Sequence, residues 1–103
     1  MKRYRIAPEA KKDLEAIWDW IAGESSAAIA TNFLWKFYET FRSIGSSPAA
    51  GVAAVDFKPE GTRKFPMGNY IIYYRPVRGG KGKILISRVL HGKRQQKRSY
   101  YEK

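Results

Sequence analysis

The amino-acid sequence predicts an α+β fold: an N-terminal strand, then an antiparallel helical hairpin packed on an antiparallel β-sheet. Two observations lead to this prediction. Residues 1–48 place apolar side chains at helical spacing in two successive segments, and residues 63–91 contain three strand-like runs joined by short turns. With 103 residues and no internal repeat, the chain is expected to form one domain, residues 1–103.

The N-terminal strand is expected at Arg3–Ile6, where charged and apolar residues alternate. The first helix is expected over residues 8–22, because proline is tolerated in a first helical turn and Gly23 is a natural stop. Trp20 lies off the apolar stripe, so we expect it to be partly exposed and to mark a partner surface. The stripe expected to face the core consists of Ala10, Leu14, Ile17, Trp18 and Ile21.

The second helix is expected to begin at a cap formed by Ser25 or Ser26 and to end at Gly45, with Pro48 just beyond it. A connection of about three residues makes the two helices antiparallel neighbours. The apolar stripe of this helix consists of Ile29, Phe33, Leu34, Phe37, Phe41 and Ile44.

Residues 49–62 show no clear periodicity and are predicted to form a long loop with at most one short turn. The strands predicted after this loop are Arg63–Phe65, Tyr70–Arg75 and Lys83–His91, with turns at Pro66–Asn69 and Gly79–Gly82. The middle strand is apolar on both faces, so it should be central, and its tyrosines should pack in the core rather than stack on nucleobases. A final short helix is expected to begin near Lys93.

The net charge of +11 is unevenly distributed along the chain. Residues 1–48 hold 7 Lys and Arg against 6 Asp and Glu, whereas residues 49–103 hold 13 against 3. A field of this kind attracts nucleic acid or an acidic protein partner. The chain has no cysteine, no signal-peptide pattern and no apolar run that approaches the ~20 residues of a membrane span, so a cytoplasmic location away from membranes is expected.

His91 is the only histidine, which excludes metal ligation by a histidine cluster. No set of His, Asp and Glu has the spacing of a zinc site, so no metal and no cofactor is expected. His91 itself follows an apolar strand and is expected to be a structural strand-end residue rather than a proton shuttle. The glycines of Gly79–Gly82 lack the helix and the Gly-Lys-Ser/Thr ending of a phosphate-binding loop.

A cationic group around the last strand and beyond it is the candidate site for a macromolecular target or another polyanion. Metal-free RNA cleavage needs cations around the phosphate and a group that moves protons, and Arg94 with Tyr100 supplies both in principle. The predicted target-binding residues are Arg63, Lys64, Arg88, His91, Lys93, Arg94, Lys97, Arg98 and Tyr100.

Several stretches, in chain order, carry a family resemblance: Ala10–Leu14, Ser47–Pro48, Arg63–Arg75 and Arg88–Arg94. The most specific are an Arg-x-Phe-Pro-x-Gly-x-Tyr run and the later Arg-Val-Leu-His-Gly. Together they resemble the ParE/RelE superfamily of bacterial type II toxins, in particular its ParE-like branch. The resemblance implies the RelE/ParE-like fold and a growth-inhibiting toxin that a cognate antitoxin silences by wrapping it.

An acidic C-terminal segment of the antitoxin would suit the basic half of the chain, and the apolar surface of the hairpin would offer anchors. The residues expected to contact the antitoxin are Trp20, Arg75 and Arg88, whereas no residue-level motif places the contacts with gyrase.

The superfamily implies two mechanisms. ParE-like members bind DNA gyrase and trap it on cleaved DNA, whereas RelE-like members cut mRNA on the ribosome. Arg94 and Tyr100 stand where the nucleases have an arginine and a tyrosine, but Tyr70 replaces a central-strand arginine. The nucleases also have a pair of lysines before the turn, and this chain has Arg63 at one of these positions and Gly61 at the other. A single preorganised donor contributes about 3 kcal/mol to stabilising the transition state, so the missing cations argue against RNA cleavage. Gyrase inhibition by binding is therefore the preferred function, and the endoribonuclease and a non-toxic homologue are the alternatives.

Overall fold

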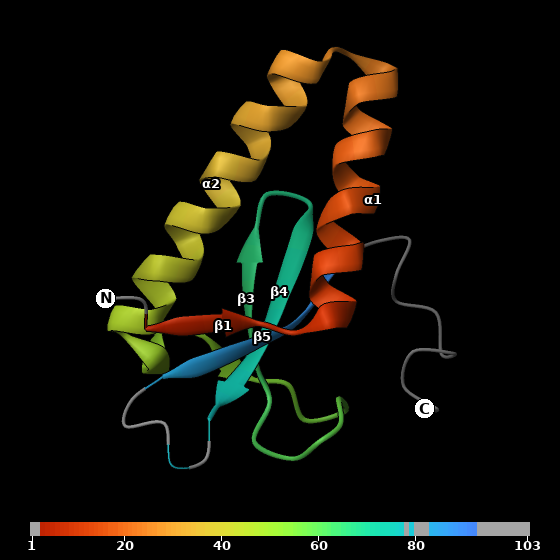
Figure 1. The fold of residues 1–103 in the computed structure, drawn as a ribbon. Helices are drawn as coiled ribbons and strands as arrows, with labels where there is room; N and C mark the ends of the chain where they lie inside the picture. Colours follow the sequence, from red (N-terminus) through yellow and green to blue (C-terminus); the bar gives the residue numbers. More distant parts are fainter. Residues whose placement is uncertain (1–2, 78, 80–82, 93–103) are drawn as a thin grey trace.

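The computed structural model describes residues 3–77, 79 and 83–92, and it confirms the predicted α+β class. Two helices pack against one face of a five-stranded sheet (Figure 1). The elements, in chain order, are β1 (Tyr4–Ile6), α1 (Pro8–Glu24), α2 (Ala27–Ser46), the 3-10 turn η1 (Pro48–Ala50), β2 (Val52–Ala53), β3 (Arg63–Met67), β4 (Tyr70–Pro76) and β5 (Ile84–His91). The helix predicted near Lys93 lies outside the described residues.

The strands lie in the order β1-β5-β4-β3-β2, and β3, β4 and β5 form the predicted antiparallel meander with β4 at the centre. The sheet is mixed rather than wholly antiparallel, because β1 pairs parallel with β5. The Ile84 N–H donates to the Arg3 carbonyl at 3.0 Å, and the Ala7 N–H donates to the Ile86 carbonyl at 2.9 Å. The partner of such a short strand lies about 80 residues away in sequence, a distance at which local patterning carries no information.

Both helices run past the glycines predicted to end them. Helix α1 continues through Gly23, and α2 begins after Ser26, whose hydroxyl accepts the Ile29 N–H at 3.1 Å. Gly45 is buried inside α2, and a Cβ at this position would lie 3.0 Å from the Cβ of Arg3. Gly45 therefore serves the close approach of α2 to the N-terminal segment, not the end of the helix.

The main core lies between the hairpin and the sheet. Its largest fully buried side chains come from α2, β4 and β5, and the aromatic rings meet edge to face, as between Phe37 and Tyr70 at 5.7 Å. All three tyrosines of the central strand are buried, which confirms that they pack in the core. The fully buried set is Phe37, Phe41, Ile44, Ile72, Tyr74, Ile84, Ile86 and Val89.

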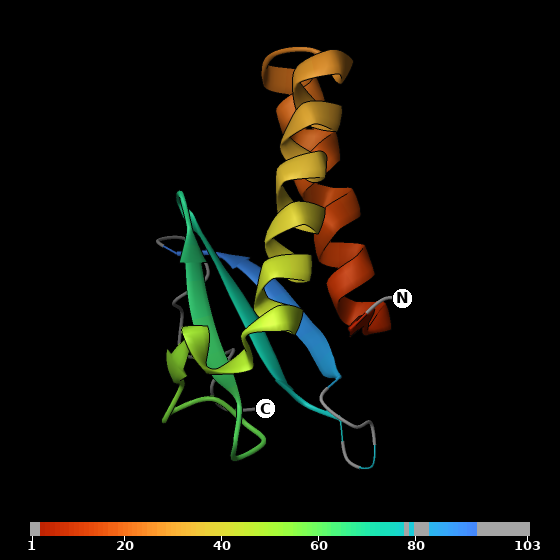
Figure 2. The same cartoon turned by 90° about the vertical axis from the view of Figure 1, so that its left-hand side faces the viewer.

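Two residues assigned to the core stripes do not face the core. Ile29 is 54% exposed, and Trp18 is half-buried in a surface hollow of the hairpin. Figure 2 shows the reason: the connected ends of the two helices project beyond the sheet. At about 1.5 Å per residue, the helices are longer than the sheet surface that covers them, so their far turns have no layer to pack against.

Residues 48–62 are more ordered than the predicted loop, since they contain η1 and the edge strand β2. The Tyr74 hydroxyl holds their start: it donates to the Pro48 carbonyl at 2.6 Å and accepts the Gly51 N–H at 2.8 Å. A Cβ at Gly51 would lie 2.6 Å from the Lys64 carbonyl, so only glycine fits this approach. At the next turn β3 extends to Met67, which shortens the predicted four-residue turn to Gly68 and Asn69.

Candidate functional site

The structure describes four of the nine predicted target-binding residues: Arg63, Lys64, Arg88 and His91. These four do not form one cationic surface, because they lie on different sides of the sheet and have different partners. The other five, Lys93, Arg94, Lys97, Arg98 and Tyr100, lie outside the described residues, as does the predicted pairing of Arg94 with Tyr100.

Arg63 at the start of β3 holds the segment that precedes β2. Its Nη2 donates to the Ala49 carbonyl at 3.3 Å and, at shorter range, to the Gly51 carbonyl. Because Tyr74 binds the same segment, one arginine and one tyrosine fix η1 against the sheet. Arg63 has a structural use in the folded chain.

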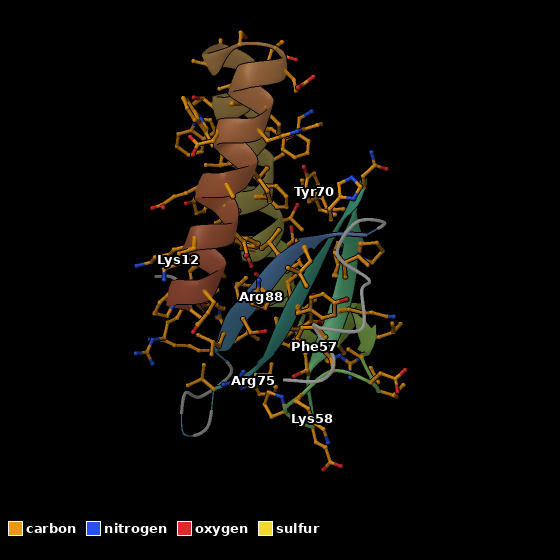
Figure 3. All side chains as sticks on the ribbon, turned by 90° about the vertical axis from the view of Figure 1, so that its right-hand side faces the viewer. Lys12, Phe57, Lys58, Tyr70, Arg75 and Arg88 are labelled. Atoms are coloured by element: carbon orange, nitrogen blue, oxygen red, sulfur yellow. The ribbon has the colours of Figure 1, made fainter. Side chains whose placement is uncertain are left out.

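Arg88 on β5 forms a two-pronged ion pair with Asp13 of α1. Its Nε and Nη2 donate to the two carboxylate oxygens at 2.8 and 2.9 Å, and the Val89 N–H donates to the same carboxylate at 2.9 Å. Strand β1 pairs with β5 only as far as Ile86, so Asp13 satisfies a backbone donor beyond the end of that pairing. In Figure 3 Arg88 lies beside α1.

Lys64 of β3 and Arg88 of β5 are the register partners of Tyr73, whose ring lies outside the main core. Phe57 covers the Tyr73 ring in a parallel stack, with the centroids 3.9 Å apart and the planes at 9°. A small apolar cluster surrounds this stack and includes Ala54 and Leu90. Phe57 thus occupies the position that a stacked base would take on Tyr73.

His91 ends β5 and packs edge to face on Tyr70 at 5.2 Å. Tyr70 lies at the opposite end of the sheet from Phe57 and Arg75 (Figure 3). It lines a small hollow of about 80 Å³ together with Asp13 and Trp20. Trp20 is 49% exposed, which confirms the prediction that it is partly exposed. Arg75, the third residue predicted to contact an antitoxin, lines a separate shallow groove of about 840 Å³ together with Arg5 and Leu85.

The sequence prediction missed Trp35, which at 63% exposure is among the most exposed large apolar side chains of the described chain. It lines an aromatic hollow of about 200 Å³ on the outer side of the hairpin, which we call the hairpin hollow. The hairpin hollow is lined by Trp18, Thr31, Leu34, Trp35 and Tyr38. The signal was a second helical stripe at Thr31, Trp35 and Tyr38, beside the core stripe of α2.

Within residues 3–77, 79 and 83–92, no three His, Cys, Asp or Glu side chains gather as metal ligands would. Neither described helix combines the length and the hydropathy that crossing a bilayer requires.

The family model of the "ParE toxin of type II toxin-antitoxin system, parDE" matches residues 4–96. The chain belongs to the ParE toxin family. It is 32% identical over 89 residues to "Toxin ParE1" of Mycobacterium tuberculosis, in strains CDC 1551 / Oshkosh and ATCC 25618 / H37Rv, covering 86% of this chain and 88% of each relative.

A solved structure described as "Chromosomal ParDE TA system from P. aeruginosa" has the same fold as this ParE family member. The TM-score is 0.71 with 17% sequence identity, covering 88% of this chain and 96% of the other. The chain is therefore the toxin component of a type II toxin-antitoxin system, and a ParDE system includes an antitoxin partner.

Proposed function

We propose that this toxin inhibits DNA gyrase by binding it, that it acts in the cytoplasm, and that the antitoxin of its own system neutralises it by covering its surface. Membership of the ParE family is the observation that carries the proposal. The resemblance noted in the sequence is to the ParE-like branch of the superfamily, whose members act on DNA gyrase rather than on messenger RNA.

The positions of the described cations support binding over RNA cleavage. Arg63 is committed to two backbone carbonyls and Arg88 to a carboxylate. A phosphate site for cleavage needs donors aimed at the charge that develops in the transition state. Arg63 and Arg88 would have to leave their present acceptors before they could bind a phosphate. For Arg88 this would leave the partly buried carboxylate of Asp13 without its partner, which is unfavourable.

A supercoiling assay with purified gyrase, relaxed plasmid and ATP tests the proposal directly. We expect the purified toxin to abolish supercoiling and to leave linear DNA after treatment with detergent and protease, because a trapped enzyme holds a broken duplex. A type I topoisomerase assayed on the same plasmid is the control and should be unaffected.

In cells, induction of the toxin alone should cause filamentation and a DNA-damage response while protein synthesis at first continues. Undiminished supercoiling at saturating toxin, together with transcripts cut on ribosomes, would replace the proposal with the endoribonuclease. Undiminished supercoiling with intact transcripts and normal growth would leave a non-toxic homologue.

A further inference from the structure

The sheet carries, on the face away from the helices, a shallow groove that no role has yet explained. It has a volume of about 840 Å³ and crosses β1, β5 and β4 beside the segment that precedes β3. We call it the arginine groove, because its lining includes Arg5 and Arg75 together with Leu85, Pro59 and Glu60.

The sheet register places the two arginines in one row across three strands. Leu85 of β5 is the register partner of both, pairing with Arg5 on β1 and with Arg75 on β4. Residues paired in this way point to the same face of a sheet. The neighbours of Leu85 in the chain, Ile84 and Ile86, are buried in the core under the helices, so the row faces the other way. Two cations therefore stand on either side of an apolar floor.

The two arginines of the row are available to an anion. Among the residues that the structure describes, the side chain of neither forms an ion pair or a hydrogen bond, in contrast to Arg63 and Arg88. Within the described lining Glu60 is the one carboxylate, and Lys58 lies at the same end of the sheet as Arg75 (Figure 3). A guanidinium group in this position can bind a phosphate without breaking an existing contact.

The spacing of the row suits the backbone of a nucleic acid. Neighbouring strands are about 4.8 Å apart, so the main chains at Arg5 and Arg75 are separated by about 10 Å. A DNA duplex carries one negative charge per ~1.7 Å of its axis, which is about six phosphates over that distance. Both guanidinium groups therefore meet phosphates in any register of the duplex, and each matches a phosphate with two donors.

The lining disfavours other ligands. A peptide adds to a sheet at a free edge, but β5 lies between β1 and β4 and is already paired on both sides. No aromatic side chain of the described chain lines the groove, so unpaired bases have no ring to stack on. No described asparagine or glutamine lines it either, so the groove has no amide that reads adenine. The features that remain are those of contact with a paired backbone, without sequence preference.

We propose that the arginine groove binds the sugar-phosphate backbone of double-stranded DNA, with Arg5 and Arg75 on its phosphates and Leu85 beneath them. The source of that DNA rests on the proposed function, because a toxin bound to gyrase lies beside the duplex that gyrase has cleaved. The groove holds the duplex while another part of the toxin surface contacts the enzyme. Simultaneous contact with both partners lengthens the life of the trapped complex.

Fluorescence anisotropy of a fluorescein-labelled DNA duplex, with the full toxin and no gyrase, measures this binding. The double variant Arg5→Ala/Arg75→Ala should weaken binding of the duplex at least about tenfold. Because each arginine neutralises a phosphate, the slope of log affinity against log salt concentration should become shallower by about 2.

The double variant Lys36→Ala/Arg42→Ala is the matched control, since it removes the same net charge from exposed positions on α2. It should weaken binding less than about twofold and leave the salt slope nearly unchanged. Glu60→Gln removes the carboxylate of the lining and should tighten binding about twofold to threefold. Thermal melts should be the same for all three proteins, because none of the substituted side chains is buried.

Absence of duplex binding, or equal losses in the two double variants, would overturn the proposal, because the duplex would then respond to net charge alone. Tighter binding of single-stranded DNA than of the duplex would contradict the preference for paired DNA. Tighter binding of a glutamate-rich peptide, lost in Arg5→Ala/Arg75→Ala, would assign the groove to an acidic protein instead.

The supercoiling assay is independent of these measurements. A toxin that binds the duplex through the arginine groove but leaves gyrase active would refute the proposed target and not the groove. A toxin that inhibits gyrase but does not bind the duplex would refute the groove and not the target.

Discussion

The two faces of the sheet are covered in different ways. The face toward the helices is sealed by a hairpin that buries large side chains such as Phe41 and Ile72 completely. Among the described residues, the cover of the opposite face lies near Tyr73 and comes from a short segment that includes Ala54 and Phe57. One face thus depends on extensive apolar packing, whereas the described cover of the other is a small apolar cluster around one ring stack. Substitutions in the core between the helices and the sheet should therefore destabilise the fold more than substitutions on the opposite face. Binding surfaces should lie outside that core.

Phe41→Ala tests the sealed face and should have the largest effect. Removing a fully buried ring that contacts Tyr4, Phe37 and Tyr38 leaves a cavity, and the free energy of unfolding should fall by about 3–5 kcal/mol. Urea denaturation followed by circular dichroism measures it. Ile29→Ala, on the same helix but 54% exposed, is the matched control and should change stability by less than about 0.5 kcal/mol. A similar loss in both variants would show that the two ends of the hairpin are equally packed.

Tyr74→Phe tests the connection between the two faces. The substitution keeps the ring in the core but leaves the Pro48 carbonyl and the Gly51 N–H without their partner. We expect a loss of about 1–3 kcal/mol in the free energy of unfolding, together with faster amide hydrogen exchange of Gly51. Tyr38→Phe is the control, because its hydroxyl has no hydrogen bond to a described residue. Unchanged exchange at Gly51 would mean that η1 is held by Arg63 alone.

Phe57→Ala tests the thinner cover and should have the smallest effect. Loss of the ring stack on Tyr73 should cost about 1 kcal/mol, because an aromatic pair contributes roughly 0.5–1.5 kcal/mol beyond its buried area. Val55→Ala, in the same segment and 85% exposed, should be neutral. Tyrosine fluorescence quenching by iodide should increase only in Phe57→Ala. A loss as large as that of Phe41→Ala would contradict the contrast between the two faces.

The core-facing stripe of each helix was predictable because it depends on the spacing of residues that are close together in the sequence. Leu14 and Phe37 recur at helical spacing with their neighbours, and a stripe of that kind must be buried wherever the helix packs. The same reasoning failed for Trp18 and Ile29, since periodicity does not show how far the covering sheet extends. The prediction that the second helix ends at Gly45 failed for a related reason. The small size of this residue allows a close contact with Arg3, which is distant in the sequence.

The candidate site was less predictable than the fold. A list of cations does not show which of them hold their own chain, as Arg63 and Arg88 do in the folded molecule. Trp20 was correctly expected to be exposed, but Trp35 was overlooked because it stands next to the apolar stripe of α2. Its importance depends on Trp18, which comes from the other helix.

The sequence by itself determined the α+β class, the hairpin, the meander and the family, because these depend on periodicity, turns and motifs within short stretches of chain. Only the tertiary structure decided the parallel pairing of β1 with β5, the pairing of Asp13 with Arg88, and the exposure of the hairpin's outer aromatic residues. Those features join residues that are distant in sequence, and contacts of that kind are set by how the layers fit together in space.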